Sequence, residues 1–201
     1  MNKITGIIIA AGLSSRMGKF KPLLMYDGKT FLENIIDKLL IICEKIIIVT
    51  GHNSDLIVNL VNLNYKNQKV VCVINSDFQS GMFSSLKVGI ESCINSDWII
   101  FHQVDQPNLP LNFYKEFTDQ IKIKYDWIQP IFEGRKGHPI LFNNNVIEKI
   151  LDANNNSNLR EISKSKEINQ YFWECSFNEI LTDLDTPNDF KKFTEGKNEI
   201  F

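Results

Sequence analysis

The chain has 201 residues, of which 43% are hydrophobic and 23% charged, and its net charge is −2. These values fit a globular protein with an apolar core, and the length favours one domain over residues 1–201. The slightly acidic balance argues against a protein that coats nucleic acid, because such a surface needs surplus Lys and Arg. No apolar run in the sequence is long enough to cross a bilayer, so no membrane partner is expected.

Short β-branched runs alternate with longer amphipathic segments, an order typical of a parallel sheet flanked by helices. We therefore expect an α/β fold, Rossmann-like and three-layered (α/β/α), with a mostly parallel central sheet. The expected strands are residues 4–10, 45–50, 70–74, 98–104, 127–132, 139–142 and 171–177. One helix is expected after the capping-box pattern at Thr30, and three more are expected over 54–63, 82–94 and 143–157. Two further helices are expected to start near Pro110 and Thr186. A polar turn, 133–138, joins two of the later strands.

The N-terminus and the cysteines both indicate a cytoplasmic protein. The apolar run 7–11 is short and continues into a charged loop, so it fits a buried strand better than a signal peptide. Cys43, Cys72, Cys93 and Cys175 form no Cys-x-x-Cys pair, which predicts free thiols in a reducing compartment.

The loop after the first strand carries the strongest functional signal. It leaves the carboxyl end of a central strand, where α/β sheets bind ligands. Gly12 and Gly18 let the backbone approach phosphate oxygens closely, and Arg16, Lys19 and Lys21 supply positive charge. The spacing fits neither a P-loop nor a dinucleotide fingerprint. The loop therefore predicts a polyanion site, with a mobile basic loop as the alternative.

Acidic residues follow two later strands. Asp105 comes directly after an apolar strand, so it faces the same crevice as the first loop and could hold Mg²⁺ beside a triphosphate. Asp183 and Asp185 flank Leu184 and point the same way if this segment is extended. A turn at Asp105 and a helix cap at Asp185 are the alternatives.

As a whole string, residues 10–21 resemble the start motif of the MobA-like NTP transferases, the molybdopterin guanylyl- and cytidylyltransferases. The matching positions are Ala10-Ala11-Gly12, Ser14, Arg16-Met17-Gly18 and Lys21. Further matching pieces occur in family order along nearly the whole chain: Gly81-Met82-Phe83-Ser84-Ser85-Leu86, Asp105-Gln106-Pro107, Gly137-His138-Pro139-Ile140-Leu141-Phe142 and Asp183-Leu184-Asp185-Thr186-Pro187. Such ordered agreement is harder to obtain by chance than any one string.

The resemblance implies roles for individual residues. Arg16, Lys21 and Asp105 would be catalytic, and Asp105 would bind Mg²⁺ together with Asp185, which ranks above Asp183. The nucleotide would be bound by Ala10, Ala11, Gly12, Ser14, Ser15, Arg16, Lys21, Ser84 and Ser85. His138 and Arg160 would border the acceptor, although a structural turn histidine is an alternative for His138.

The identity of the base and of the acceptor stays open. Ala10-Ala11-Gly12 resembles the cytidylyl branch, whereas the guanylyl branch typically has Ala-Gly-Gly and an Asp where Phe20 stands. The methyl group of Ala11 favours CTP by narrowing the pocket, but one methyl discriminates by only ~1–3 kcal/mol. Residues 154–160 lack the glycines and the acid of the family's Gly-Asp-x-Gly-Ala-Arg-like segment, which leaves the acceptor in doubt.

The expected reaction is attack of an acceptor phosphate oxygen on the α-phosphorus of CTP, with release of pyrophosphate. A phosphate monoester is largely ionised near neutral pH, so no catalytic base is required. The resemblance implies a molybdopterin-type acceptor and a transient contact with a molybdoenzyme or its chaperone. The alternatives are a guanylyltransferase, a sugar- or polyol-phosphate cytidylyltransferase, and a non-enzymatic nucleotide-binding regulator.

Overall fold

The computed structural model describes residues 2–66, 69–93 and 96–198. A twisted central sheet forms the middle of the fold. Its strand order is β10-β7-β9-β6-β1-β4-β5, and β8 pairs with β7. The strands are β1 (Ile4–Ala10), β4 (Lys45–Thr50), β5 (Val70–Ile74), β6 (Trp98–Gln103), β7 (Trp127–Phe132), β8 (Arg135–Lys136), β9 (Ile140–Asn143) and β10 (Gln170–Glu174). Only the pairs that involve β8 or β9 are antiparallel among these. The expected mostly parallel sheet is confirmed.

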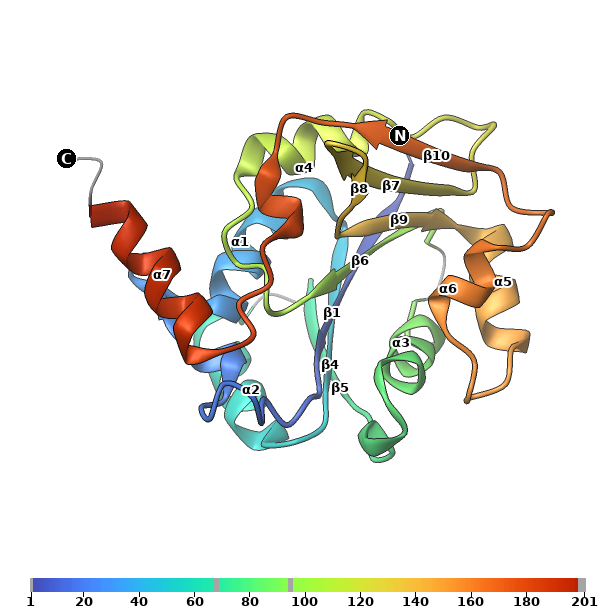
Figure 1. The fold of residues 1–201 in the computed structure, drawn as a ribbon. Coiled ribbons are helices and arrows are strands. Elements are labelled where there is room, and N and C mark those ends of the chain that lie inside the picture. Colours follow the sequence, from blue (N-terminus) through green and yellow to red (C-terminus); the bar gives the residue numbers. More distant parts are fainter. Residues whose placement is uncertain (1, 67–68, 94–95, 199–201) are drawn as a thin grey trace.

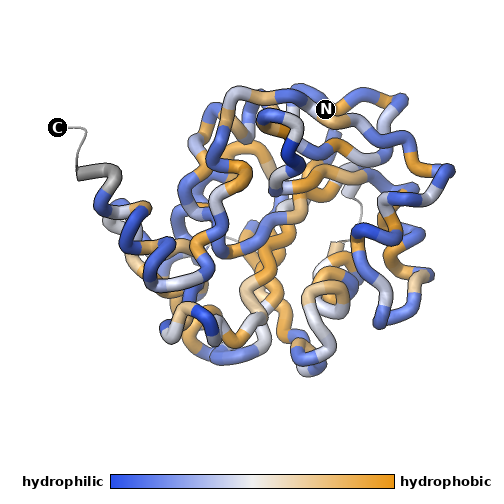
Figure 2. Tube along the Cα trace, viewed as in Figure 1, coloured by the Kyte–Doolittle hydropathy of each residue, from blue (hydrophilic) through white to orange (hydrophobic). Residues whose placement is uncertain are grey.

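Helices cover both faces of this sheet, as Figure 1 shows. One face carries α1 (Phe31–Ile42), α2 (Ser54–Asn64) and α4 (Leu111–Thr118), and the other carries α3 (Met82–Glu91), α5 (Asn144–Asp152) and α6 (Leu159–Ser163). Neighbouring residues of β1 face opposite layers: Ile8 packs in the cluster of Ile35 and Phe113, whereas Ile7 packs in that of Leu86. The three-layer arrangement is confirmed, and the hydrophobic residues concentrate along its central strands (Figure 2).

The sequence signals for β1 and α1 correspond to specific contacts. β1 pairs in parallel with β4 and β6, and its residues are buried except for the half-buried Ile9. The capping box before α1 is confirmed, because Glu33 N–H donates to Thr30 Oγ at 3.2 Å and Thr30 N–H donates to the Glu33 carboxylate at 2.9 Å.

Several element boundaries differ from the expected ones. β6 ends at Gln103 instead of 104, and β10 covers 170–174 instead of 171–177. The helix expected over 143–157 ends at Asp152, because Ala153 is extended and the following asparagines favour turns. The helix expected over 82–94 ends at Glu91, and residue 94 lies outside the described residues. Pro110 caps α4 instead of lying in its first turn.

Small elements were not expected from the sequence. A hairpin joins β2 (Met25–Tyr26) to β3 (Lys29–Thr30) through Asp27 and Gly28, which both have positive φ angles. The polar turn 133–138 contains β8, and α6 follows the asparagine-rich loop. Short 3-10 helices cover Lys21–Leu23, Phe78–Ser80 and Asn178–Leu181.

The last helix, α7 (Pro187–Asn198), starts where it was expected and lies at the outside of the molecule (Figure 1). Phe190 contacts Phe31 with ring centroids 5.7 Å apart, and Phe193 contacts Tyr26 at 5.0 Å. Across the described ranges, no helix combines the length and apolar character needed to span a membrane. The four cysteines are free.

Candidate active site

A cavity of about 360 Å³ opens where β1 and β6 end. The parallel register places Ile9 opposite Gln103, so the chain leaves both strands at the same level of the sheet. The lining residues are Ile9, Ala10, Ala11, Gly12, Ser14, Ser15, Arg16, Lys21, Pro22, Phe78, Gly81, Met82, Ser85, Gln103, Val104, Asp105 and Asp185. The predicted polyanion loop thus forms one wall, and both predicted metal ligands lie on the same cavity.

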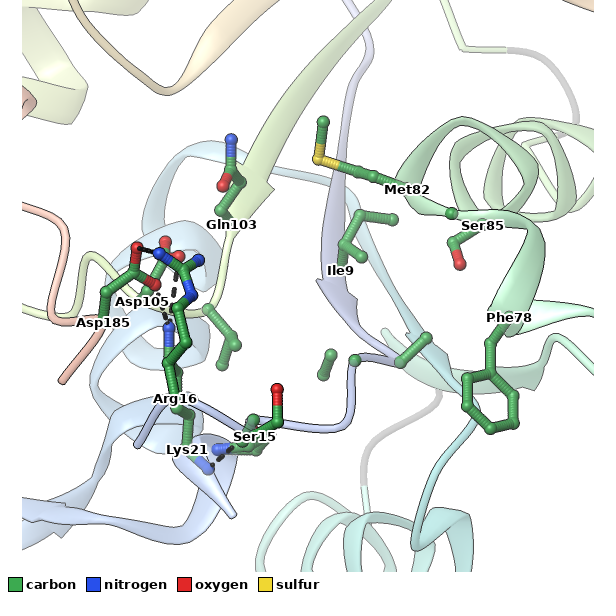
Figure 3. Close-up of a pocket in the computed structure, with 17 residues that line it drawn as sticks. Ile9, Ser15, Arg16, Lys21, Phe78, Met82, Ser85, Gln103, Asp105 and Asp185 are labelled. Carbon is green, nitrogen blue, oxygen red and sulfur yellow. Dashed lines mark hydrogen bonds and ion pairs between the residues drawn. The ribbon is translucent and has the colours of Figure 1, made fainter. Parts of the chain in front are cut away.

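Charged side chains gather at one end of the cavity (Figure 3). The Lys21 ammonium forms an ion pair with Asp185 and lies 3.7 Å from Asp105 Oδ2. Arg16 Nη1 lies 2.7 Å from Asp185 Oδ2. The Lys21 side chain is 10% exposed and that of Arg16 is 71% exposed. Two carboxylates that are distant in sequence therefore converge on the buried ammonium of Lys21, while the guanidinium of Arg16 pairs with Asp185 from the exposed side.

The first loop is held in a defined turn that positions Lys21. Ser14 and Gly18 have φ angles of 54° and 67°, in the left-handed region. Met17 N–H donates to the Ser14 carbonyl oxygen at 3.0 Å, and Lys21 N–H donates to Ser14 Oγ at 3.1 Å. The Met17 side chain within this loop is buried. These contacts favour a built phosphate-binding turn over a mobile basic loop.

Asp105 has the electrostatic environment of a ligand for a cation. Burial raises the pKa of its carboxyl to about 6; Lys21 opposes this rise, and Asp183 and Asp185 add to it. Its Oδ1 atom is buried and has no hydrogen-bond partner among the described residues. A hard divalent cation would satisfy this oxygen. The described residues hold no cluster of three or more His, Cys, Asp or Glu side chains suited to a metal ion.

The two candidate acids at the end of the chain have different surroundings. Gln106 Nε2 donates to Asp183 Oδ1 at 2.8 Å and to the Ile180 carbonyl oxygen at 3.1 Å. Leu184 N–H donates to the Asp105 carbonyl oxygen at 3.0 Å, which joins the two acidic segments. Asp185 lines the cavity and Asp183 does not. The geometry therefore favours Asp185 as the partner of Asp105. The contact of Gln106 could be suspected only from its place beside Asp105.

The two predicted serines at the start of α3 also differ. Ser85 lines the cavity, whereas Ser84 lies behind it and donates from its hydroxyl to the Gly81 carbonyl oxygen at 2.8 Å. Both serine oxygens accept hydrogen bonds from Asn75, a residue that the sequence analysis did not single out. Gly81, whose φ is 104°, begins the helix and lines the cavity as well.

The two residues predicted to border the acceptor lie outside this lining. His138 packs edge-on against Phe101 with ring centroids 6.4 Å apart, and burial lowers its pKa although Asp183 acts in the other direction. Arg160 is exposed in α6, next to Leu159. A second cavity of about 250 Å³ has Leu159 and Phe101 in its lining and shares Gly81 and Met82 with the first. The two predicted acceptor residues thus each neighbour a residue of this second cavity.

Comparison with known proteins identifies nucleotidyltransferases as relatives of this chain. The MobA-like NTP transferase domain matches residues 6–170 of the chain. The molybdenum cofactor cytidylyltransferase of Escherichia coli K12 is 32% identical over 202 residues, covering all of both chains. A probable molybdenum cofactor guanylyltransferase of Bacillus cytotoxicus is 30% identical over 75% of this chain and 73% of its own length. The structure of Rv0371c from Mycobacterium tuberculosis in complex with manganese superposes with a TM-score of 0.73 at 20% identity, covering 96% of this chain and 98% of that one.

Proposed function

Because the chain belongs to the MobA-like NTP transferase domain family and is a nucleotidyltransferase, we propose that it transfers CMP from CTP to a molybdopterin-type acceptor. The observation that carries this proposal is the convergence of Arg16, Lys21, Asp105 and Asp185 on one cavity. A basic loop opposite two acids suits a triphosphate and its divalent cation. The full-length similarity to a cytidylyltransferase supports the choice of substrates.

The roles within the cavity follow from position and charge. Arg16 and Lys21 bind the triphosphate, and the remaining nucleotide contacts come from Ala10, Ala11, Gly12, Ser14, Ser15 and Ser85, which all line the cavity. Ser84, which was expected to touch the nucleotide, is assigned to the support of the α3 start because its hydroxyl is bonded to Asn75 and Gly81.

Asp105 and Asp185 would hold Mg²⁺. The unpartnered buried oxygen of Asp105 and the pairing of both carboxylates with one cation fit a hard divalent ion. When bound, the ion would neutralise charge on the triphosphate and on the departing pyrophosphate. The manganese complex of Rv0371c, a protein of the same fold, supports a divalent ion, and magnesium is our specific proposal.

The chemistry requires positioning more than proton transfer. A phosphate oxygen of the acceptor attacks the α-phosphorus, forming one P–O bond as the bond to pyrophosphate breaks. Lys21 holds a fixed positive charge beside the acids, and the exposed Arg16 side chain can turn from Asp185 to the triphosphate. Both side chains stabilise the charge that develops on the leaving group. We place the acceptor toward the second cavity, with His138 and Arg160 at its border.

Ala11 supports CTP over GTP. It is buried and lines the cavity, and a glycine at this position would lack its methyl group. A guanylyltransferase is the second candidate, because a probable guanylyltransferase is 30% identical over three quarters of the chain. The discrimination from one methyl is worth ~1–3 kcal/mol, so the preference is measurable and not absolute.

Pyrophosphate release tests this proposal. We expect the wild-type protein with Mg²⁺ and molybdopterin to release pyrophosphate fastest from CTP among the four nucleoside triphosphates. Asp105→Ala should lower the rate at least about 100-fold, a loss on the scale of removing one preorganised charged contact, and should keep a cooperative melting transition. Asp119→Ala, which removes an exposed acid beyond α4, is the matched control and should keep the rate.

Each opposite result has a defined meaning. An active Asp105→Ala enzyme would overturn the assignment of the site. A faster rate with GTP would identify a guanylyltransferase, and CTP binding without pyrophosphate release would identify a nucleotide-binding regulator.

A further inference from the structure

A buried amide lies directly behind the cavity wall at Ser85. Asn75 follows β5 and is 3% exposed. Its Nδ2 atom donates to Ser84 Oγ and to Ser85 Oγ, each at 3.0 Å. Ser85 is 1% exposed and lines the cavity. Asn75 therefore contacts the residue that faces a ligand without lining the cavity itself.

The orientation of this amide is determined by the backbone. Asp77 N–H donates to Asn75 Oδ1 at 2.9 Å. A backbone N–H can only donate, so the atom that faces it must be the amide oxygen, and the nitrogen must face the two serines. The usual ambiguity between the oxygen and nitrogen of an Asn side chain is thereby removed. Both amide protons are used, one for each serine.

This orientation fixes the polarity of Ser85. A serine hydroxyl has one proton and two lone pairs. Since Asn75 donates to Ser85 Oγ, that oxygen acts as an acceptor there, and no other hydrogen bond of this hydroxyl occurs within the described residues. Its proton is thus left for the cavity. Ser84 differs, because its proton is used by the carbonyl oxygens of Gly81 or Asp77.

We infer that Asn75 is a positioning residue that makes Ser85 a hydrogen-bond donor to an acceptor atom of the nucleoside. The inference rests on the proposed function. Figure 3 shows Ser85 and Phe78 at the opposite end of the cavity from Asp185 and Arg16. A nucleotide whose phosphates bind the charged end would place its nucleoside near Ser85. The partner is an acceptor atom of the cytosine ring or a hydroxyl oxygen of the ribose.

The test is a double-mutant cycle on the dissociation constant of CTP, measured calorimetrically with Mg²⁺ and the full chain. In Asn75→Asp the new carboxylate can only accept hydrogen bonds. The Ser85 hydroxyl therefore donates its proton to this carboxylate and presents only lone pairs to the cavity. We expect Asn75→Asp and Ser85→Ala each to weaken binding about 3- to 10-fold, the range of one hydrogen bond. In the Ser85→Ala background, Asn75→Asp should have an effect at least about threefold smaller than in the wild type.

An equal factor in both backgrounds would show that Asn75 acts independently of Ser85 and would overturn the inference. A wild-type protein that binds none of the four triphosphates would instead overturn the proposed function. Ser96→Ala is the matched control, because it removes another buried serine hydroxyl, one bonded to Thr5, and should leave CTP binding within about twofold of the wild type, less than the loss of one hydrogen bond.

Two further measurements complete the test. If Asn75→Asp lacks a cooperative melting transition, Asn75→Ala replaces it, because that variant also releases the Ser85 proton from its fixed direction and must show the same non-additivity. Repeating the Ser85→Ala comparison with dCTP identifies the nucleoside oxygen. A penalty that disappears supports the inference with the ribose 2′ oxygen as partner, and one that persists supports it with another acceptor atom of the nucleoside.

Discussion

Single side chains define the candidate site more sharply than the sequence motifs do. Asp183 and Asp185 are equivalent in an extended segment, yet Gln106 binds the first and Lys21 the second. The sequence contains no signal for this difference, because both partners lie far from these acids along the chain. Asn75 could be suspected as a polar residue directly after an apolar strand, but its two serine contacts depend on how α3 folds back over the sheet.

His102 provides a residue-level prediction about stability. This fully buried side chain donates from Nδ1 to the Gln103 carbonyl oxygen at 2.6 Å, so its Nε2 accepts from the Tyr114 hydroxyl at 2.7 Å. Burial lowers the pKa of His102 from 6.5 to about 3, against the opposing effect of the Gln103 hydrogen bond. A lowered pKa means that the unfolded chain binds the proton first, so stability falls as the pH drops below about 6.5 and is unaffected above it.

We expect the wild type to lose about 2 to 3 kcal/mol more unfolding free energy than His102→Gln between pH 7 and pH 4.5. Urea unfolding at the two pH values measures the difference. Ser96→Ala removes a buried hydroxyl in place of a histidine and should keep the wild-type dependence. Equal losses in wild type and His102→Gln would contradict the burial argument.

At the scale of elements, predictability from the sequence depends on how much apolar surface an element buries. The ranges of β1, β4, β5 and β7 were predicted correctly. The signal is clearest in β1 and β4, because their β-branched runs are buried on both faces. The hairpin β2–β3 and strand β8 have two residues per strand, too few for a periodic pattern. The reversed direction of β9 was not predicted either, since it depends on pairing with β6 and β7 and not on local composition.

The packing of α3 on the sheet gives an element-level prediction. A Cβ atom at Gly89 would lie 2.9 Å from methyl groups of Ile7 and Val49, on β1 and β4. Alanine is the better helix former by about 1 kcal/mol, but overpacking a core costs about 1–3 kcal/mol. We expect Gly89→Ala to lower the unfolding free energy by up to about 2 kcal/mol, the upper end of the difference between these effects.

Chemical denaturation measures this loss, and Gly12→Ala is its control because an added Cβ there meets no atom within 4 Å. A Gly89→Ala variant as stable as Gly12→Ala would show that α3 can shift away from the sheet without cost.

At the scale of the whole molecule, the site joins the two ends of the chain. Lys21 and Asp185 are 164 positions apart, and each is followed closely by a segment of one shared aromatic cluster. The cluster contains Tyr26 and Phe31 after the first loop, Leu184, and Phe190 and Phe193 of α7. Because α7 begins two residues after Asp185, we expect its docking on the hairpin to hold that carboxylate against Lys21. We therefore expect this helix, which lies outside the sheet, to fix the position of Asp185 (Figure 1).

This arrangement predicts that activity is more sensitive than global stability to the loss of Phe190. Its ring contacts Phe31 at 5.7 Å but lies apart from the main core clusters, so Phe190→Ala should cost only about 1–2 kcal/mol of unfolding free energy, below the 3–5 kcal/mol of a core phenylalanine. Nucleotidyl transfer should nevertheless fall at least about 10-fold, because small misplacements of groups in the site have large effects on rate. Phe172→Ala removes a half-buried phenylalanine from edge strand β10 and should have a comparable stability loss with near wild-type transfer.

If both variants lost activity only in proportion to stability, α7 would have no part in positioning the site. The position of Asp185 would then have to be set within the 180–185 segment itself, through the hydrogen bond from Leu184 N–H to the Asp105 carbonyl oxygen.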